Sequence, residues 1–481
     1  LAYDRMRIPA AAFEILACLA VVAVASLAFV AGWLTVNGAV VLTVLLLTSL
    51  IVLSWVNLGH GRHPVFLFLC TLMFFQGGRL LVFCLGGGDL MEVAEPMQVH
   101  LYQNLPFSAG LINEGIVLLC LNLTAICIYA PCRWKYIQYP APATAPVRQY
   151  LPYLYLVFFA TLPLQLFRNY RYYQWIQDHG GYMSIFQSHA ELAASIPLIV
   201  RAVPLISLPA FLAIFVFEHR RTAANLTTAL YLASASFILV VGSRMAFFRL
   251  ILALWFATRV KSNRKTRVAS LAFLVLACVL IADVVGQLRE NSGEALGYSF
   301  LPLQFLAVQG QSLDVTTITV AYREYFQPHI GSYLWNDLKN AFVSIDTAHY
   351  SRGRELAFDA PVLLNVELFR AGYGTGGSYI GEEYLMGGLA GVVVLSWLIG
   401  LGLQYLCTLS RSVVTLYLVV LTLPEVLFMP RGSILDWASG LLRNAISILI
   451  LWVGWKFYSL VCSVRNEHAS ALGGPSGVLE T

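Results

Sequence analysis

The chain has 481 residues, of which 59% are hydrophobic and only 11% are charged. A soluble protein carries about 25% charged residues and has too little interior for this much apolar side chain, so soluble globular, disordered, collagen-like and disulfide-rich classes are excluded. The composition is that of an all-α polytopic membrane protein, and the net charge of +5 gives no indication of a nucleic-acid partner.

Apolar segments follow one another along the chain, and most approach the length of about 20 residues that a membrane-spanning helix needs. We expect about twelve spans in a single transmembrane domain over 1–465, followed by a flexible cytoplasmic tail at 466–481. In chain order the segments lie near 9–32, 35–56, 64–86, 109–131, 151–168, 197–218, 224–241, 245–259, 268–286, 376–405, 412–430 and 439–460.

Basic residues predict how the bundle is oriented. Sixteen of the 30 Lys and Arg residues lie in short segments on one side, among them the cluster from Arg259 to Arg267. The preference for positive residues in cytoplasmic loops places that side, with both termini, in the cytoplasm. The opposite side then carries moderate loops near 87–108 and 169–196 and one large loop near 287–375, between the ninth and tenth spans.

The other fourteen basic residues lie on the outer half, where insertion disfavours them, and thirteen are arginine. Arginine binds phosphate or carboxylate through a rigid fork, so we interpret the set as an anion site. The alternative is a chain that simply prefers Arg to Lys. The set is Arg79, Arg168, Arg171, Arg201, Arg244, Arg249, Arg289, Arg323, Lys339, Arg352, Arg354, Arg370, Arg431 and Arg443.

Arg244 is the strongest single candidate in this set. The span at 245–259 rises only about 22 Å, and the basic cluster holds its inner end, so the turn Gly242-Ser243-Arg244 is expected at the depth of lipid head groups. Arg244 then begins a helix, where free backbone N–H groups also attract anions. The alternative is an arginine that only extends its side chain to the interface.

Aromatic residues crowd the second moderate loop beside Arg168 and Arg171. Such rings stack on sugars, but belts at the membrane interface have the same composition, and the belt is the favoured interpretation. The residues are Tyr170, Tyr172, Tyr173 and Trp175.

Two stretches of the large outer loop are predicted helices, 312–326 and 332–345, and we expect them to lie over the bundle at the interface. The second places Leu334, Trp335, Leu338, Phe342 and Ile345 on one face. The following run, 346–355, combines acids, bases and arginines. It is either a solvated charged loop or part of a site, with Asp346 and His349 as candidate bases and Arg352 and Arg354 as candidate ligands.

A glycine-rich run, 372–384, leads into the tenth span. Ser378 is a plausible N-cap residue, and Glu382 and Glu383 lie in the first turns. The glutamates either stabilise the helix dipole or supply a carboxylate base. Adjacent residues lie about 100° apart on a helix, so at most one faces a given pocket. Tyr373 and Tyr379 are candidate substrate contacts.

This layout resembles the Wzy-type polysaccharide polymerases, also called O-antigen or oligosaccharide repeat-unit polymerases. The resemblance lies in the Gly242-Ser243-Arg244 turn, the long penultimate outer loop, and the run Gly376–Gly391 that leads into Gly400-Leu401-Gly402. It covers most of the chain in layout, and at residue level mainly 242–249 and 372–402.

The resemblance implies a multi-pass glycosyltransferase of the GT-C type in the bacterial inner membrane, with its active site and the large loop facing the periplasm. Such enzymes move a growing glycan from undecaprenyl diphosphate onto the non-reducing end of a new lipid-linked unit. Arg244 carries over as a diphosphate-binding residue, joined as candidate ligands by Arg168, Arg171, Arg323, Arg352, Arg354 and Arg370. A chain-length regulator and a flippase of the same pathway are candidate partners.

Fixed arginines would stabilise the charge that develops on the leaving diphosphate, and a carboxylate or histidine would take the acceptor proton. The candidate bases are Glu382, Glu383, Asp346 and His349. No D-x-D-like cluster occurs in the outer loops, so we expect neither metal nor cofactor. The rival functions are an O-antigen ligase that uses lipid A-core as acceptor, a lipid-linked oligosaccharide flippase, and a membrane acyltransferase, which the lack of an H-x-x-x-D motif disfavours.

Overall fold

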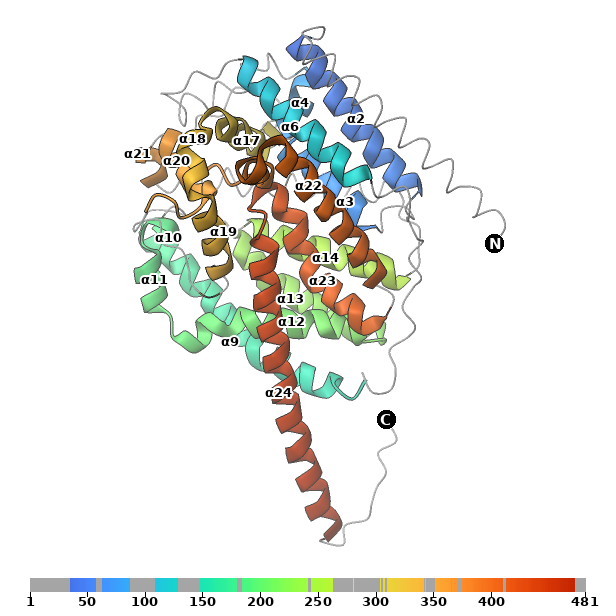
Figure 1. Ribbon diagram of the computed structural model, residues 1–481. Coiled ribbons are helices and arrows are strands. Elements are labelled where there is room, and N and C mark those ends of the chain that lie inside the picture. Colours follow the sequence, from blue (N-terminus) through green and yellow to red (C-terminus); the bar gives the residue numbers. More distant parts are fainter. Residues whose placement is uncertain are drawn as a thin grey trace, which may run out of the picture.

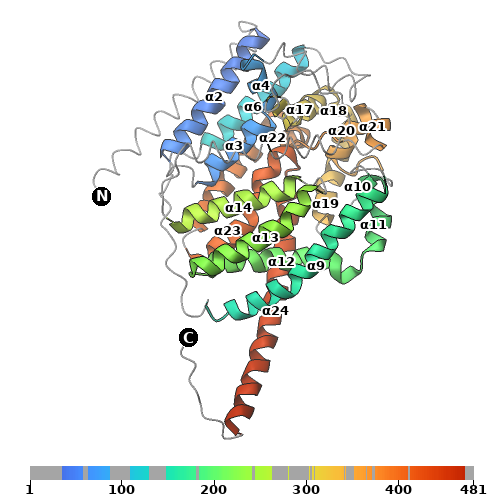
Figure 2. The ribbon, with the colours of Figure 1, turned by 180° about the vertical axis from the view of Figure 1, so that it is seen from behind.

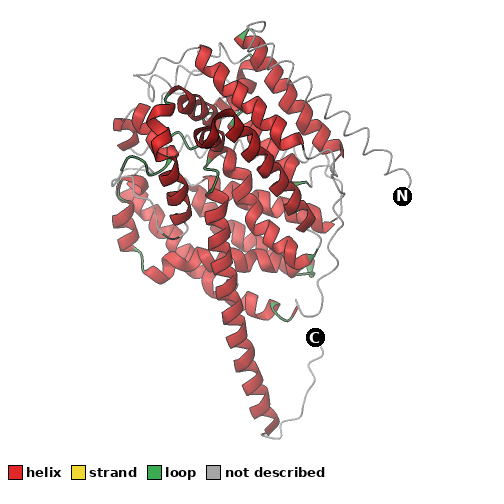
Figure 3. Ribbon diagram, in the orientation of Figure 1, coloured by secondary structure: helices red, strands yellow, loops and turns green. Residues whose placement is uncertain are grey.

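A computed structural model describes residues 35–57, 63–86, 109–128, 148–179, 184–240, 244–262, 309–340, 351–364, 366–370, 374–409 and 412–471, with isolated positions 280, 303, 306, 307 and 342. Within these residues every regular element is a helix (Figure 3). The predicted spans 9–32 and 268–286, apart from residue 280, and the end of the tail from 472 lie outside the described residues.

Helices occupy all the remaining predicted spans. The last helix continues to Ala471, into the predicted tail. They are α2 (Val36–Asn57), α3 (Pro64–Phe75) with α4 (Gly78–Cys84), α6 (Ala109–Ile128), α9 (Leu151–Asp178), α12 (Leu198–Phe217), α13 (Arg221–Val240), α14 (Arg244–Ser262), α22 (Tyr379–Leu409), α23 (Val413–Phe428) and α24 (Asp436–Ala471). Two short helices, α10 (Ser184–Gln187) and α11 (His189–Ser195), follow α9.

Among the described helices, α2, α9, α12, α22, α23 and α24 are each long and apolar enough to cross a membrane. The pair α3 and α4 passes the same test together, although it is bent by 69° at the break. The described residues therefore contain six such spans, or seven with the bent pair. The total of twelve, the placement of the termini and the single-domain organisation stay predictions.

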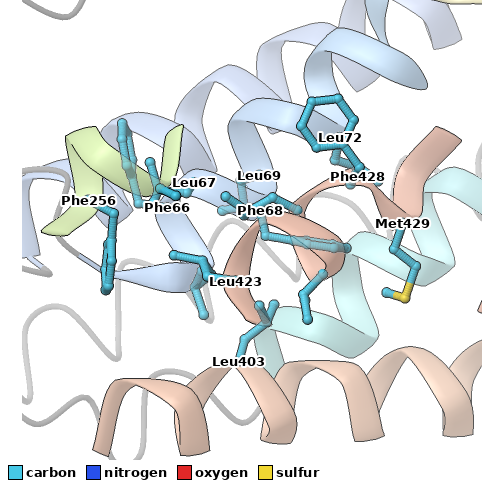
Figure 4. Packing of buried hydrophobic residues seen from close by; sticks show 14 of the residues in the cluster. Phe66, Leu67, Phe68, Leu69, Leu72, Phe256, Leu403, Leu423, Phe428 and Met429 are labelled. Carbon is cyan, nitrogen blue, oxygen red and sulfur yellow. The ribbon is translucent and has the colours of Figure 1, made fainter. Parts of the chain in front are cut away.

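One apolar core joins the spans (Figure 4). Helix α3 is apolar on all sides, and a helix of that kind is stable only when it is surrounded. It packs against α22 and α23, with the ring of Phe75 centred 5.4 Å from that of Phe428. Leu403 and Leu423 lie beside its buried face (Figure 4). The core thus fixes the position of α22 relative to α23.

The described parts of the large outer loop form a small helical unit, which we name the cap (312–340, 351–364 and 366–370). It contains α17 (Ser312–Ala321), α18 (Arg323–Phe326), the 3-10 turn η1 (Gln327–His329), α19 (Ile330–Lys339), α20 (Leu356–Leu364) and α21 (Val366–Arg370). These helices gather on one side of the molecule (Figures 1 and 2). Their apolar side chains, among them Phe326, Tyr333 and Leu356, form a second core with Leu385 of α22. The cap is therefore packed onto the spans.

Helix α17 does not lie over the bundle as the sequence predicts, because it is inserted between α6 and α22. Its residues from Ser312 to Thr319 are all buried. Thr316, Thr317 and Thr319 satisfy their hydroxyls on carbonyls four residues back, which lets a threonine-rich helix enter an apolar interior. Its one acid, Asp314, forms a buried ion pair with Arg79 of α4, at 2.6 Å.

Helix α19 buries a different face from the predicted one. Tyr333 and Asp337 are buried, whereas Trp335 and Phe342 are 60% and 67% exposed. The Tyr333 hydroxyl donates to Asp359 Oδ2 at 2.6 Å, and Asp337 Oδ2 contacts the Ser433 hydroxyl. These hydrogen bonds decide which side of the helix turns inward, and hydrophobic periodicity alone does not register them.

Helix α22 is broken near its start. Gly387 and Gly388 leave the helical conformation, and Gly388 has a φ of +60°, which glycine adopts without strain. In a straight helix Glu383 and Ser396 would be about 20 Å apart. Here Ser396 Oγ donates to Glu383 Oε2 at 2.8 Å. The first segment of α22 is therefore folded back against the second.

Candidate functional site

A cavity of about 130 Å³ lies where the cap meets the ends of the spans. This volume is close to that of engineered cavities that admit a six-membered ring. Its walls come from the first turns of α14 and α22, from the cap, and from the connection between α23 and α24. The lining residues are Arg249, Asp337, Glu355, Leu356, Ala357, Gly376, Gly377, Glu382, Phe428, Arg431, Gly432, Ser433 and Asp436.

Two segments, 374–378 and 429–433, run close together along one wall. Gly377 N–H donates to the Arg431 carbonyl at 2.9 Å, and a Cβ on Gly377 would lie 2.9 Å from the Gly432 carbonyl oxygen. Only glycine fits this approach. Gly376, with a φ of +78°, also adopts a conformation that favours glycine. The glycine-rich run thus serves to bring these two segments together.

Gln76, at the break between α3 and α4, forms hydrogen bonds with both of these segments. Its buried amide Nε2 donates to the Pro430 carbonyl at 2.8 Å and to Ser378 Oγ at 3.2 Å. Thr316 Oγ1 of α17 lies 3.3 Å from Gln76 Oε1 and 2.6 Å from Ser378 Oγ. A satisfied buried network of this kind makes a wall rigid.

Carboxyl groups gather around the hydroxyl of Ser433. Glu382 Oε2 accepts from Ser433 Oγ at 2.7 Å and from Ile434 N–H at 2.8 Å. Asp337 Oδ2 contacts the same hydroxyl, and Asp436 Oδ2 accepts from Ser433 N–H at 3.0 Å. A hydroxyl has one hydrogen, so Ser433 cannot donate to Glu382 and Asp337 at once. Both contacts are hydrogen bonds only when one of the two carboxyls carries a proton.

The carboxyls that the cap contributes hold protons more tightly than usual. Burial raises the pKa of Asp337 to about 8, and the charge of Asp436 adds to the rise. Burial also raises the pKa of Glu355 to about 7, although the hydrogen bond from Asn340 opposes the rise. The cavity can therefore both release and accept a proton near neutral pH.

These pKa values predict how stability depends on pH. Folding raises the pKa of Asp337, so the folded protein keeps a proton that the unfolded chain loses above about pH 4. This stabilisation is complete below pH 4 and is lost as the pH rises to about 8, by at most about 1.4 kcal/mol per pH unit for one proton. Glu355 acts in the same direction up to about pH 7.

We expect Asp337→Asn to make thermal stability less dependent on pH between 4 and 8. The unfolding temperature of detergent-solubilised protein, measured at a series of pH values for wild type and variant, tests this. Equal pH dependence in the two proteins would contradict the assignment.

Two guanidinium groups share the cavity with these acids. Arg249 Nη1 pairs with Glu425 Oε2 at 2.6 Å and lies over the ring of Phe428, while its buried Nε has no hydrogen-bond partner. Arg431 donates to Gln309 Oε1 and lies over Phe75. Carboxylates suit sugar hydroxyls, and arginines suit phosphate oxygens. The cavity thus offers both kinds of contact within one ring-sized space.

Glu382 and its neighbour Glu383 face different surroundings. Glu382 lines the cavity, whereas Glu383 is buried on the side of α6. There Glu383 Oε2 accepts from Ser396 and, at 3.5 Å, from Asn122. Tyr379, a predicted substrate contact, is fully buried and donates to Asn122 Oδ1 at 2.8 Å. Both Glu383 and Tyr379 therefore belong to the packing of α22 against α6.

None of the predicted arginine ligands with a described side chain lines the cavity. Arg323 lies over Tyr384, and Arg352 over Tyr325 at 3.7 Å. Arg168 lies over Tyr172, Arg171 donates to Gln174, Arg354 lies in the loop before α20, and Arg370 is exposed at the end of α21.

The other predicted site residues are described only in part or not at all. Arg244 is the first residue of α14, as the sequence predicts, but the position of its side chain lies outside the described part of the chain. Asp346, His349 and Tyr373 also lie outside it. Within the described part, no group of three or more His, Cys, Asp or Glu side chains has the geometry of a metal site.

Several cavity residues were not selected from the sequence. Arg249 and Arg431 belong to the outer arginines, and Asp337 and Glu355 to the charges of the large loop, but nothing singles them out there. The clearest signal is the turn Pro430-Arg431-Gly432-Ser433. A charged side chain in such a short turn between two spans must stay close to the ends of those spans.

Comparison with known proteins adds one finding. The family model described as O-antigen polysaccharide polymerase Wzy matches residues 13–459. No curated protein and no solved structure matches the chain.

Proposed function

The chain belongs to the O-antigen polysaccharide polymerase Wzy family, and on that premise we propose that its cavity is where lipid-linked repeat units are joined. The family and the apolar helices make the protein a membrane protein of O-antigen repeat-unit polymerisation. We further propose a GT-C-type glycosyltransferase of the bacterial inner membrane that works at the periplasmic face, on glycans carried by undecaprenyl diphosphate.

The observation that carries the proposal is the meeting of carboxyls and guanidiniums in one ring-sized cavity. In the reaction, a hydroxyl of the new unit forms a bond to the anomeric carbon of the growing glycan. The bond between that carbon and the diphosphate oxygen breaks, and the lipid diphosphate leaves with the electron pair. The proton of the hydroxyl passes to a carboxylate, so all atoms and charges balance.

Glu382 is the proposed base. Its Oε2 is held by Ser433 and Ile434, so its position in the cavity is fixed before the acceptor arrives. Asp337, on the other side of Ser433, is the partner that shares a proton with it. This assignment replaces Asp346, His349 and Glu383, which the sequence left equal with Glu382.

Arg249 and Arg431 are the proposed ligands of the leaving diphosphate. Negative charge grows on that group as the glycosidic bond breaks, so fixed cations stabilise the transition state more than the ground state. Arg244 begins the same helix as Arg249 and is proposed to bind the diphosphate from the helix N-terminus. Contacts for the glycan outside the cavity are then left to Arg168, Arg171, Arg323, Arg352, Arg354 and Arg370, and Tyr373 stays a predicted glycan contact.

The direct test is polymerisation in a purified system. Protein reconstituted in vesicles with lipid-linked repeat units should produce a ladder of longer glycans without nucleotide sugar or ATP. Transfer only onto added lipid A-core would make the protein a ligase, and movement of units across the membrane without any new bond would make it a flippase.

Lysine in place of Arg431 is expected to lower the rate of polymerisation by about 100- to 1,000-fold, because lysine keeps the charge but loses the fork that holds phosphate. The initial rate of ladder formation measures the loss, and Arg244→Lys is tested in the same way. Arg201→Lys is the control, since Arg201 is exposed on α12 and does not line the cavity. Near-normal activity of a variant removes that arginine from the site.

A further inference from the structure

Helix α19 presents two unlike faces, and only one of them belongs to the cavity. Tyr333 and Asp337 are buried on one face. Trp335 is two residues from each of them. At about 100° per residue this is a rotation of about 200° around the helix, so Trp335 is on the opposite face. Phe342 follows in the turn after the helix and is also exposed. An exposed indole and phenyl beside a site of polar side chains call for a surface that covers them.

The depth of this apolar face follows from its neighbour Asp337. Asp337 contacts Ser433, which lies in the connection between the end of α23 and the start of α24. Trp335 and Lys339 are each two residues from Asp337, so they differ from it by only about 3 Å along the helix axis. Helix α19 contacts α24 and runs in about the same direction (Figures 1 and 2). Its outward face therefore points sideways, at the level where the two spans have their ends.

The residues on that face have the chemistry of a membrane interface. Lys339 is exposed, and its Nζ lies 5.4 Å from the centre of the Trp335 ring. Tryptophan is enriched at the head-group level, and lysine beside it brings a positive charge to lipid phosphate while its stem stays apolar. A protein partner would explain the exposed aromatic residues, and bulk water would explain the charge. Lipid explains both, and it already surrounds the adjoining spans.

We propose that α19 is seated in the lipid surface on the cap side of the membrane, with Trp335 and Phe342 against acyl chains and Lys339 beside phosphate head groups. The opposite face of the helix then holds Asp337 in the cavity at head-group depth. Resting on the proposed function, this places the cavity wall at the level where the diphosphate of a lipid-linked glycan lies. The lipid contact itself does not depend on that function.

Photo-crosslinking tests the contact directly. The photoreactive amino acid p-benzoylphenylalanine replaces Trp335 or Phe342, one at a time, in protein reconstituted in phosphatidylethanolamine and phosphatidylglycerol vesicles. Glu324 is the control position, because it is exposed on α18 and belongs to the polar surface of the same cap. After illumination, mass spectrometry of the protein counts the lipid adducts.

We expect phospholipid adducts at 335 and 342 at least about tenfold above those at 324. Adduct yields at 335 and 342 equal to the yield at 324, or adducts with protein instead of lipid, would overturn the proposal. The assay uses no glycan substrate and no activity. Failure of polymerisation with clear lipid adducts therefore rejects only the proposed function, and the converse result rejects only the seating of α19.

Discussion

Replacing Glu382 by glutamine is expected to lower polymerisation by about 100- to 10,000-fold, the usual contribution of a general base, while Glu383→Gln keeps a rate close to that of wild type. The two residues are adjacent and chemically identical, so each variant is the other's matched control. The expected difference rests only on where the fold places the two carboxyls.

Glutamine at 382 preserves the oxygen that accepts from Ser433 and from Ile434, so the wall should stay in place. The amide has no basic oxygen for the acceptor proton, and the chemistry is lost. Glutamine at 383 likewise preserves the oxygen that accepts from Ser396. Its amide nitrogen replaces an Oε1 that has no hydrogen-bond partner, so the network around Asn122 and Tyr379 loses nothing.

The initial rate of ladder formation, with folded yield from gel filtration as a control, separates the outcomes. Inactive Glu383→Gln beside active Glu382→Gln would move the base to the α6 side of the helix. Equal loss in both variants with normal yield would mean that the polar network, and not one carboxyl, sets the rate. The pH profile of residual activity in Glu382→Gln should also lose its acid limb.

The second large effect concerns stability. Arg79→Met is expected to cost about 3–5 kcal/mol, because Asp314 keeps its buried position but loses its ion-pair partner. Both side chains of the pair are about 5% exposed, so water cannot replace the guanidinium. Arg79 also donates to the carbonyl of Ala307, which lies before the cap in the chain.

The matching double variant, Arg79→Met with Asp314→Leu, should recover most of this loss, since two apolar side chains of similar volume need no charge partner. Denaturant unfolding in detergent micelles measures both variants and the single Asp314→Leu, so that the coupling energy of the pair can be extracted. A double variant no more stable than Arg79→Met would show that the remaining carboxylate of Asp314 is not the cause of the loss, and would contradict this explanation.

Hydrophobicity predicted the helices of these spans within the described residues, and six of them, or seven with the bent α3–α4 pair, are long and apolar enough to cross a membrane. It was insufficient for α17 and α19. The threonines of α17 are internally satisfied, so a helix that carries three threonines and an acid lies inside the bundle. The inward face of α19 is chosen by Asp359 and Ser433, which are 26 and 96 residues away from their partners. Partners at such separations leave no periodic trace in the helix itself.

For the candidate site, the sequence predicted the types of side chain better than the individual residues. The glycine-rich run and its glutamates pointed to the end of α22 that lines the cavity, but the choice between Glu382 and Glu383 required the break at Gly387 and Gly388. The excess of outer arginines indicated an anion site, yet the two that reach the cavity are distinguished only by the packing of α14 and of the α23–α24 connection. Composition reports which side chains are present, and the fold decides which of them meet.

The long-range contacts of Gln76 and Arg79 also limit the order in which contacts form while the chain is synthesised. Arg79 meets an acid 235 residues later in the chain, and Gln76 holds a carbonyl 354 residues later. Both polar side chains thus leave the ribosome long before these partners exist, while the first spans are already being inserted. A nascent chain stopped before residue 430 would have the bent α3–α4 pair with this contact unmade, and a membrane protease could distinguish it from the finished protein. Completion of the last turn between spans is then the step that lets Gln76 form its hydrogen bond to the Pro430 carbonyl.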